Sequence, residues 1–332
     1  MLLYVETKSK DAAFHFSVEE YFMRHPNFNE PIIMIWQTGK CTMLGNYQVA
    51  EAEIDINYAN QNNIQIVRRS SGGGTIFTDS GTLLLTIILP CAEDEYTQQS
   101  AKEKLSELVV DTLNSIGIPA KFEGRNDVTV SGKKISGLAQ FVKNNRICSH
   151  CSLLYDTDLD MLTRVLQVDE EKIQSKAIRS VRSRVTNIKE HMSEPLSTQD
   201  FLNFLKQKLH EKESMTEYSL SDNSLAEINK IYNEKYANDT WTFGSSPKFS
   251  FNSSKRFPGG KVEVYLDVIN GIVSSCSIRG DFLGIVPIRE LEELFEEIEF
   301  QRQVFNDALD KISVEEHLGT VTKDELLSCI FD

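Results

Sequence analysis

The sequence lacks an apolar run long enough to cross a membrane. A membrane helix needs about 20 consecutive apolar residues, and no run in this chain approaches that length. The first residues, MLLYVETKSKDAAFHF, also lack the basic region, apolar core and small-residue cleavage site of a secretion signal. We therefore expect a cytoplasmic protein with no membrane partner.

Positive charge and cysteine are both scarce. Lysine and arginine number 35 against 49 aspartates and glutamates, which gives a formal net charge of -14. This balance argues against a nucleic-acid partner, because binding to a phosphate backbone depends on clustered lysine and arginine. The six cysteines are spread through 332 residues, unlike the dense spacing of a small secreted disulfide scaffold, so we expect reduced thiols.

The chain is long enough for a substantial core, and 40% of its residues are hydrophobic. Because domains cluster near roughly 100 to 200 residues, this length predicts two domains. The composition becomes loop-like around Phe243-Gly244-Ser245-Ser246-Pro247, and strand patterns resume after it. We therefore predict one domain over 1–244 and a second over 245–332, and by default a monomer.

Apolar periodicity predicts a mixed α and β core. The apolar spacing over 11–25 fits one stripe of an amphipathic helix, and a longer helix is predicted over 99–116. Short β-branched runs bounded by turn signals predict buried strands at 32–36, 64–67 and 82–89.

Turn signals and weaker patterns complete the predicted order. The pairs Ser131-Gly132 and Asn144-Asn145 suit the positive φ angles of tight hairpin turns. The acidic run over 290–299 is most simply a solvated helix face. Further helices are predicted near 201–209, with Ser197 as a cap, and near 225–232, and further strands over 261–268 and 272–278.

A glycine loop, Arg68-Arg69-Ser70-Ser71-Gly72-Gly73-Gly74, lies between two predicted strands. Its glycines can bring backbone N–H groups close to a ligand while the arginines supply positive charge, a combination that suits a carboxylate or a phosphate. The alternative is a flexible or merely tight connection, which the adjoining arginines disfavour. The loop has neither the lysine that closes a Walker loop nor the spacing of a dinucleotide-binding fingerprint.

A second polar cluster reads Glu123-Gly124-Arg125-Asn126-Asp127 and leads into a basic hairpin with Lys133 and Lys134. Asp127 and Asn126 offer hard oxygen ligands for Mg²⁺, and a lysine can stabilise charge on a phosphate and on an attacking carboxylate together. Such a site could activate an acid with ATP. Taken alone, these residues are also typical of an ordinary turn with surface charges.

The stretch Cys148-Ser149-His150-Cys151 resembles half of a metal site, but the sequence has no second pair of cysteine or histidine to complete a structural zinc. A Cys/His nucleophile is disfavoured because neighbours in a strand point to opposite faces, so His150 and Cys151 would diverge. We expect cysteines buried in a core, and the sequence shows no convincing Ser/His/Asp set.

Three segments together resemble the lipoate-protein ligase family of the biotin and lipoate ligase superfamily. They are RRSSGGGTIFTD at 68–79, GRND at 124–127 and GKKISGLAQ at 132–140. The likeness continues beyond residue 245, where the chain resembles the accessory domain of bacterial-type ligases. It implies an α+β fold, with a mixed-sheet biotin/lipoate ligase-like catalytic domain and a small α/β accessory domain at the C-terminus.

The resemblance also implies roles for particular residues. The implied ATP-binding residues are Arg69, Gly74, Thr75, Ile76, Phe77, Asn126, Asp127 and Lys134. The implied lipoate-binding residues are Ser71, Gly72, Gly73, Lys134, Ser136, Gly137 and His150. Lys134 would be the catalytic residue and would touch both lipoate and the α-phosphate, and Asp127 would bind the metal. One departure is Cys151, since many relatives have glycine after the histidine, which puts the local packing in doubt.

The implied reaction begins with the formation of lipoyl-AMP from lipoate and ATP with Mg²⁺, and the lysine of an acceptor protein then attacks the adenylate. The resemblance implies acceptors among the lipoyl domains of 2-oxoacid dehydrogenases or the glycine cleavage H protein. One rival is a lipoyl or octanoyl transferase, which uses a catalytic cysteine, but Arg125-Asn126-Asp127 stands where that cysteine is expected. The other rival is a non-catalytic lipoate-binding module, against which Lys134 and the intact glycine loop argue.

Overall fold

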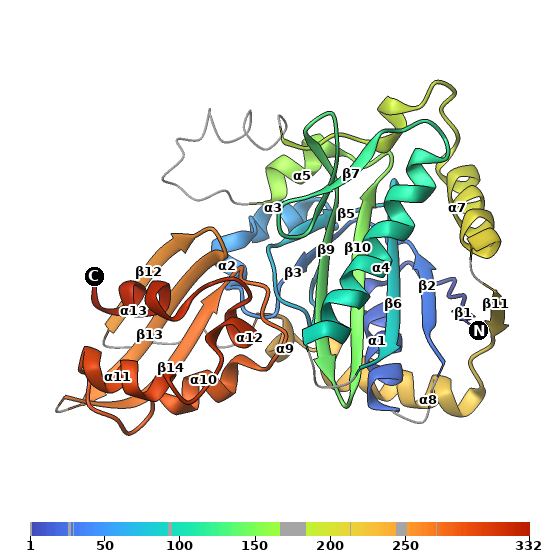
Figure 1. Cartoon of the computed structure of the whole chain (residues 1–332). Coiled ribbons are helices and arrows are strands. Elements are labelled where there is room, and N and C mark those ends of the chain that lie inside the picture. The colour runs from blue at the N-terminus through green and yellow to red at the C-terminus, as the bar shows by residue number, and fades with distance from the viewer. Residues whose placement is uncertain are drawn as a thin grey trace.

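The computed structural model describes residues 2–25, 28, 30–91, 95–166, 184–212, 214–243, 251–269 and 271–332. Within these residues the largest element is an eight-stranded mixed sheet (Figure 1). The strand β1 is parallel to both of its neighbours, and the other paired strands are antiparallel. In spatial order the strands are β11 (Met215–Tyr218), β1 (Leu2–Val5), β2 (Ile32–Trp36), β6 (Thr82–Pro90), β10 (Arg146–Leu154), β9 (Lys133–Lys143), β8 (Asp127–Val130) and β7 (Ala120–Glu123).

Helices cover both faces of this sheet, which explains why its central strands are buried along nearly their whole length. Residues of α4 (Glu95–Asn114) and α7 (Thr198–Lys212) pack on one face, and residues of α1 (Ala12–Arg24) and α8 (Asp222–Ile231) pack on the other. Along β6, Leu83 and Leu85 join the first core, whereas Leu84 and Ile88 join the second. The predicted α+β class is therefore confirmed.

The predicted secondary structure agrees closely with the observed elements where periodicity is strong. The helix predicted over 11–25 is α1, which begins after Asp11, whose side chain caps it by accepting from the Ala13 N–H at 2.9 Å. The predicted strand over 32–36 is β2, and the longer helix predicted over 99–116 is α4, which lies a few residues earlier. Both predicted hairpin turns have the expected positive φ angles. The values are 53° and 74° at Ser131 and Gly132, and 52° and 56° at Asn144 and Asn145.

A second, smaller sheet carries the glycine loop. Within the described residues its three strands lie in the order β4 (Gln65–Arg68), β3 (Cys41–Leu44) and β5 (Ile76–Thr78), and the loop joins β4 to β5. Residues of three short helices form a small core against it. These helices are α2 (Ala50–Glu53), α3 (Ile56–Gln61) and α5 (Leu159–Val165). The 3₁₀ turn η1 (Ile188–His191) precedes α7 in the chain, and its Ile188 packs in the core of the large sheet.

The C-terminal residues 251–332 form a unit with its own sheet and core, seen to one side of the large sheet in Figure 1. The predicted boundary at 244/245 falls within 244–250, which lie outside the described residues. The strands of this unit are β12 (Phe251–Phe257), β13 (Gly260–Ile269) and β14 (Ile272–Gly280), and its helices are α10 (Ile288–Leu294), α11 (Arg302–Leu309), α12 (Val314–Leu318) and α13 (Lys323–Phe331).

The prediction that the acidic run over 290–299 is a solvated helix face was wrong at Glu292. This side chain is buried, and its carboxylate accepts from the Ile278 N–H at 2.8 Å and from Arg279 at 3.1 Å. The buried carboxylate is tolerated because two hydrogen-bond donors of β14 satisfy it, and these bonds also tie α10 to β14. None of the described helices is both long and apolar enough to span a bilayer.

The remaining described segment, 214–243, joins the two parts of the chain. After β11, α8 continues directly as a π-helical turn, η2 (Tyr232–Tyr236). A separate short helix, α9 (Asp239–Phe243), follows after a two-residue break. The predicted helix near 225–232 is thus confirmed as α8, although the π-helical turn that follows it was not predicted.

Candidate active site

The buried Arg69 braces the glycine loop. The Arg69 guanidinium donates to four loop or strand atoms: the carbonyl oxygens of Met43 (2.7 Å), Gly72 (2.8 Å) and Gly74 (2.8 Å) and the Ser71 hydroxyl (3.0 Å). Burial, together with the nearby Arg68, lowers the pKa of Arg69 to about 10. Arg69 is still cationic at neutral pH, so the loop is held in one conformation around a fixed positive charge.

The glycine loop also touches the C-terminal unit. The Gly73 N–H donates to the Phe282 carbonyl oxygen at 2.9 Å, and the Phe282 ring stacks on Tyr47 with 4.9 Å between centroids. A methyl group on Gly72 would lie only 2.5 Å from the Phe282 oxygen. The absence of a side chain at Gly72 is therefore what lets the two parts of the chain approach so closely.

The hairpin of β8 and β9 brings Lys134 beside Asp127. The Lys134 Nζ lies 2.7 Å from Asp127 Oδ1, and both side chains are 36% exposed. Gly137 faces Asp127 across the two strands, and a methyl group at Gly137 would lie 2.8 Å from the Lys134 Nζ. Asn126 is fixed nearby, because its amide nitrogen donates to the Leu138 carbonyl oxygen at 2.7 Å.

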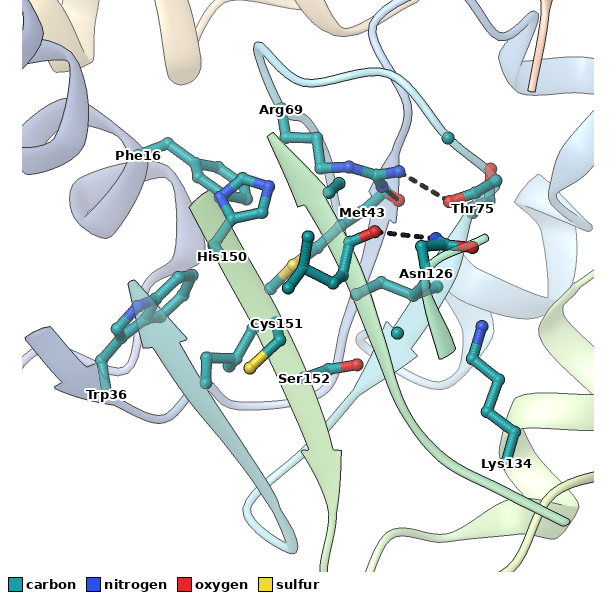
Figure 2. Close-up of a pocket in the computed structure, with 17 residues that line it drawn as sticks. Phe16, Trp36, Met43, Arg69, Thr75, Asn126, Lys134, His150, Cys151 and Ser152 are labelled. Atoms are coloured by element: carbon teal, nitrogen blue, oxygen red, sulfur yellow. Dashed lines mark hydrogen bonds between the residues drawn. The ribbon is translucent and has the colours of Figure 1, made fainter. Parts of the chain in front are cut away.

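The glycine loop and this hairpin line a common cavity of about 130 Å³ (Figure 2). At one end Arg69, Asn126 and Lys134 supply polar groups. The rest of the lining includes several large apolar residues of the core that contains α1, namely Phe16, Trp36, Met43 and Leu84. A narrow cavity with a cationic end and an apolar end suits an acyl chain that carries a carboxylate.

His150 connects this cavity to α1 and to the glycine loop. Its Nε2 lies 2.7 Å from the Ser71 hydroxyl, and its Nδ1 lies 3.2 Å from Glu19. Glu19 also accepts from the Thr86 hydroxyl at 2.6 Å, and Thr86 accepts from the Trp36 indole N–H at 3.0 Å. The chain of bonds thus runs from Trp36, in the apolar part of the cavity, to Ser71.

Ser71, His150 and Glu19 have the spacing of an acyl-transfer triad, which the sequence did not reveal because they are far apart in the chain. Ser71 has no exposed surface and does not line the cavity, and its oxygen also accepts from Arg69. Its hydroxyl is therefore placed to orient the loop and the imidazole, and a substrate in the cavity would not meet it.

Cys148 lies beside the same two residues, and the ligand atoms of Glu19, Cys148 and His150 all lie within 4.8 Å of one another. Burial, followed by the charge of Glu19, raises the pKa of the Cys148 thiol well above its usual value. The thiol stays protonated and donates a hydrogen bond to Glu19. Hydrogen bonds therefore already satisfy the polar atoms of these three residues. Cys151 belongs to the core on the opposite face of the sheet, in line with the prediction that these cysteines are buried.

The structure brings most of the predicted site residues together. Those that line the cavity are Arg69, Gly73, Gly74, Thr75, Ile76, Asn126, Lys134, Gly137 and His150. Ser71 and Ser136 are buried behind it, and Asp127 reaches it through Lys134. Gly72 faces Phe282, and the Phe77 side chain packs in the core beneath the small sheet.

Sequence reasoning missed Glu19, Trp36 and the apolar lining. The positions Phe16, Glu19, Glu20 and Met23 have helical spacing and are all buried on α1. Two glutamates at core-facing helix positions could have indicated a polar network here, because a buried carboxylate needs hydrogen-bond partners.

The fold and the cavity suit a class of enzyme that acts on a carboxylate-bearing chain beside a cationic, glycine-lined site. The family model described as "Lipoyl protein ligase A/B catalytic domain" matches residues 11–210, and the model described as "Bacterial lipoate protein ligase C-terminus" matches residues 246–330. The chain belongs to the lipoate-protein ligase family, and we identify it as an enzyme that ligates lipoate to protein.

Full-length relatives support this assignment. The chain is 33% identical to the lipoate-protein ligase LplJ of Bacillus subtilis, over 99% of this chain and 100% of the relative. It is 31% identical to lipoate--protein ligase 1 of Staphylococcus aureus, over 96% of each chain.

Solved structures show the same fold. The structure of LipL1 from P. falciparum in complex with lipoate is 23% identical and covers 98% of this chain and 97% of its own, with a TM-score of 0.78. The bipartite lipoate protein ligase of Thermoplasma acidophilum, solved in a study that includes its lipoyl domain, is 28% identical and covers 75% of this chain and 98% of its own, with a TM-score of 0.65.

Proposed function

We propose that this enzyme uses ATP to convert lipoate into lipoyl-AMP and then transfers the lipoyl group to a lysine of an acceptor protein. Amide formation from a free carboxylate is uphill in water, so the acid needs activation. The observation that carries the proposal is the common cavity, in which Lys134 and the arginine-braced glycine loop meet one end of an apolar channel.

Lys134 is the proposed catalytic residue. Its ammonium group can stabilise the negative charge that develops as the lipoate carboxylate attacks the α-phosphate. Arg69 and residues 74–77, which include the last glycine of the loop, are proposed to bind ATP, while Gly73, Gly137, His150 and the apolar lining hold the lipoyl chain. Catalysis then rests on positioning and charge, with no covalent intermediate on the protein.

Asp127 and Asn126 fit a proposed Mg²⁺ ion. A carboxylate and an amide oxygen are hard ligands, and Mg²⁺ in nucleotide sites is commonly held by one or two carboxylates and by phosphates. The Asn126 amide nitrogen is engaged by Leu138, so its oxygen is the atom that can serve as a ligand. The ion would supply charge neutralisation on the phosphates.

The acceptors we propose are lipoyl domains of 2-oxoacid dehydrogenases or the glycine cleavage H protein. The Thermoplasma acidophilum work, which pairs a ligase with a lipoyl domain, supports this choice. We also propose a catalytic domain over 1–244 and an accessory domain over 245–332, which the ranges of the two family matches support. The cytoplasm is the proposed location, in keeping with six buried thiols.

The test is adenylation in the absence of any acceptor. The protein is incubated with lipoate and magnesium-ATP, and pyrophosphate release and lipoyl-AMP are followed by mass spectrometry. We expect adenylate from the wild type and a loss of about 100- to 1,000-fold for Lys134→Ala, which is typical of removing one group that stabilises a developing charge.

The matched control is Lys133→Ala, because Lys133 is the exposed neighbour of Lys134 on the same hairpin. It should retain nearly full activity. If the wild type makes no adenylate, the proposed function is wrong and transfer from an acyl carrier becomes the function to test. If the wild type makes adenylate but both lysine variants lose activity equally, the specific catalytic role of Lys134 is wrong.

A further inference from the structure

Two consecutive serines of the glycine loop are held by two consecutive glutamates of α1. Glu19 reaches Ser71 through His150. Ser70 is held differently, because its hydroxyl lies 2.7 Å from the Tyr236 hydroxyl and accepts from Lys235 Nζ at 2.8 Å. Both of these partners come from the π-helical turn η2.

Glu20 holds these two partners in place. Its Oε2 accepts from Lys235 at 3.2 Å and from the Tyr236 hydroxyl at 3.2 Å, and the Glu20 side chain has no exposed surface. Burial raises the pKa of Tyr236 well above its usual value, so its hydroxyl keeps its proton. Because Tyr236 donates that proton to Glu20, its oxygen is left to accept from Ser70.

The helix α9, which follows η2, contacts Arg68, the last residue of β4. The Trp241 ring lies 4.2 Å from Lys235 Nζ, and its indole N–H donates to the Arg68 carbonyl oxygen at 2.9 Å. The Arg68 Nε in turn donates to the Thr242 carbonyl oxygen at 2.9 Å. Residues 211–245 lie between the two family-model matches, so neither match assigns a role to these contacts.

The π-helical turn η2 carries both of the residues that contact Ser70. The wider turn inserts a residue into an otherwise α-helical segment, and such turns are frequent at functional sites. Here η2 follows α8 directly and presents Lys235 and Tyr236 to the same hydroxyl group.

We propose that Lys235 and Tyr236 are positioning residues for ATP, acting through Ser70 to hold the glycine loop in its binding conformation. This inference rests on the proposed function, in which that loop binds ATP. A loop with fixed backbone N–H groups binds a polyphosphate without first having to be ordered.

The test compares Tyr236→Phe with Tyr232→Phe in the full-length protein. Each variant removes one hydroxyl from the same π-helical turn, but the Tyr232 hydroxyl donates to Asp11 at 2.7 Å, and within the described residues it has no hydrogen bond to the loop. For Tyr236→Phe we expect the KM for ATP in adenylation to rise about 5- to 10-fold, the effect of one lost hydrogen bond. Its kcat should change less than about twofold, because the lost contact supports binding.

Two further measurements separate positioning from general destabilisation. In a Ser70→Ala background, Tyr236→Phe should cause no additional rise in KM, because its partner is already gone. Without substrates, hydrogen exchange at the amides of 70–74 should be faster in Tyr236→Phe than in Tyr232→Phe.

The outcomes distinguish the two proposals. If the wild type forms adenylate but both tyrosine variants have the same KM, the positioning role is wrong and the proposed function stands. If the wild type forms no adenylate, the proposed function fails, and hydrogen exchange alone decides whether Tyr236 holds the loop: equal rates in the two variants would overturn that role.

Discussion

Replacing Glu20 by glutamine should destabilise the protein at neutral pH and have little effect in acid. The carboxylate is fully buried, and it accepts from Arg24, Lys143, Lys235 and Tyr236. Burial alone would raise its pKa, but the charges and hydrogen bonds of Lys235, Lys143 and Arg24 outweigh burial and lower the pKa from 4.5 to about 2.

The magnitude and the pH range follow from that pKa. A shift from 4.5 to about 2, at about 1.4 kcal/mol per pKa unit, corresponds to on the order of 3 kcal/mol of folding free energy. Because the pKa is lower in the folded state, this stability is fully present above pH 4.5. It is lost as the pH falls from about 4.5 toward about 2, where the carboxyl group becomes protonated and resembles glutamine.

The assay is urea unfolding followed by tryptophan fluorescence, at intervals between pH 3 and pH 7, for the wild type and for Glu20→Gln. The difference in unfolding free energy should be on the order of 3 kcal/mol at pH 7 and should shrink steadily below pH 4.5. Glu211→Gln is the matched control, because Glu211 pairs with Lys208 on the surface, where solvent screens the charge.

Two results would refute this reasoning. The first is a gap between Glu20→Gln and the wild type that is as large at pH 3 as at pH 7, since the loss would then come from packing. The second is the absence of any gap at pH 7, since the paired cations would then have no net effect on stability.

Two further predictions concern the site itself. Asp127→Asn should change the unfolding free energy by less than about 1 kcal/mol, because its pair with Lys134 is partly exposed. The same change should lower pyrophosphate release at least about 10-fold, since one such lost interaction is worth about 1.4 kcal/mol; normal release would argue against its role. Gly72→Ala should cost about 1–3 kcal/mol in thermal unfolding without substrates, because its methyl group would press on the Phe282 oxygen. Gly74→Ala meets no atom within 4 Å and serves as its control, so equal losses would contradict the clash.

The elements with strong local patterns could be predicted from the sequence. The apolar spacing of 11–25 predicted α1, and the β-branched runs predicted β2 and β6, because helix and strand periodicities are properties of neighbouring residues. The hairpin turns at Ser131-Gly132 and Asn144-Asn145 followed from residues that tolerate positive φ.

Part of the site could also be predicted, because some of its residues belong to local sequence patterns. The glycine loop and the Lys134 hairpin are continuous motifs, so their chemistry could be recognised before their positions were known. That they line one cavity depends on the pairing of β8 with β9 and on the small sheet that carries the loop. Apart from the family resemblance, no pattern in the sequence indicated that geometry.

The sequence by itself determined the periodic elements, the turn residues and the two motifs that mark the chain as a lipoate-protein ligase. Only the tertiary structure decided that Glu19 holds Ser71 through His150 and that Glu20 holds Ser70 through Lys235 and Tyr236. Buried carboxylates, a histidine and a π-helical turn acquire these partners only when residues 79 to 216 positions apart pack together. Their role follows from burial and the need to satisfy polar groups there, which no local pattern encodes.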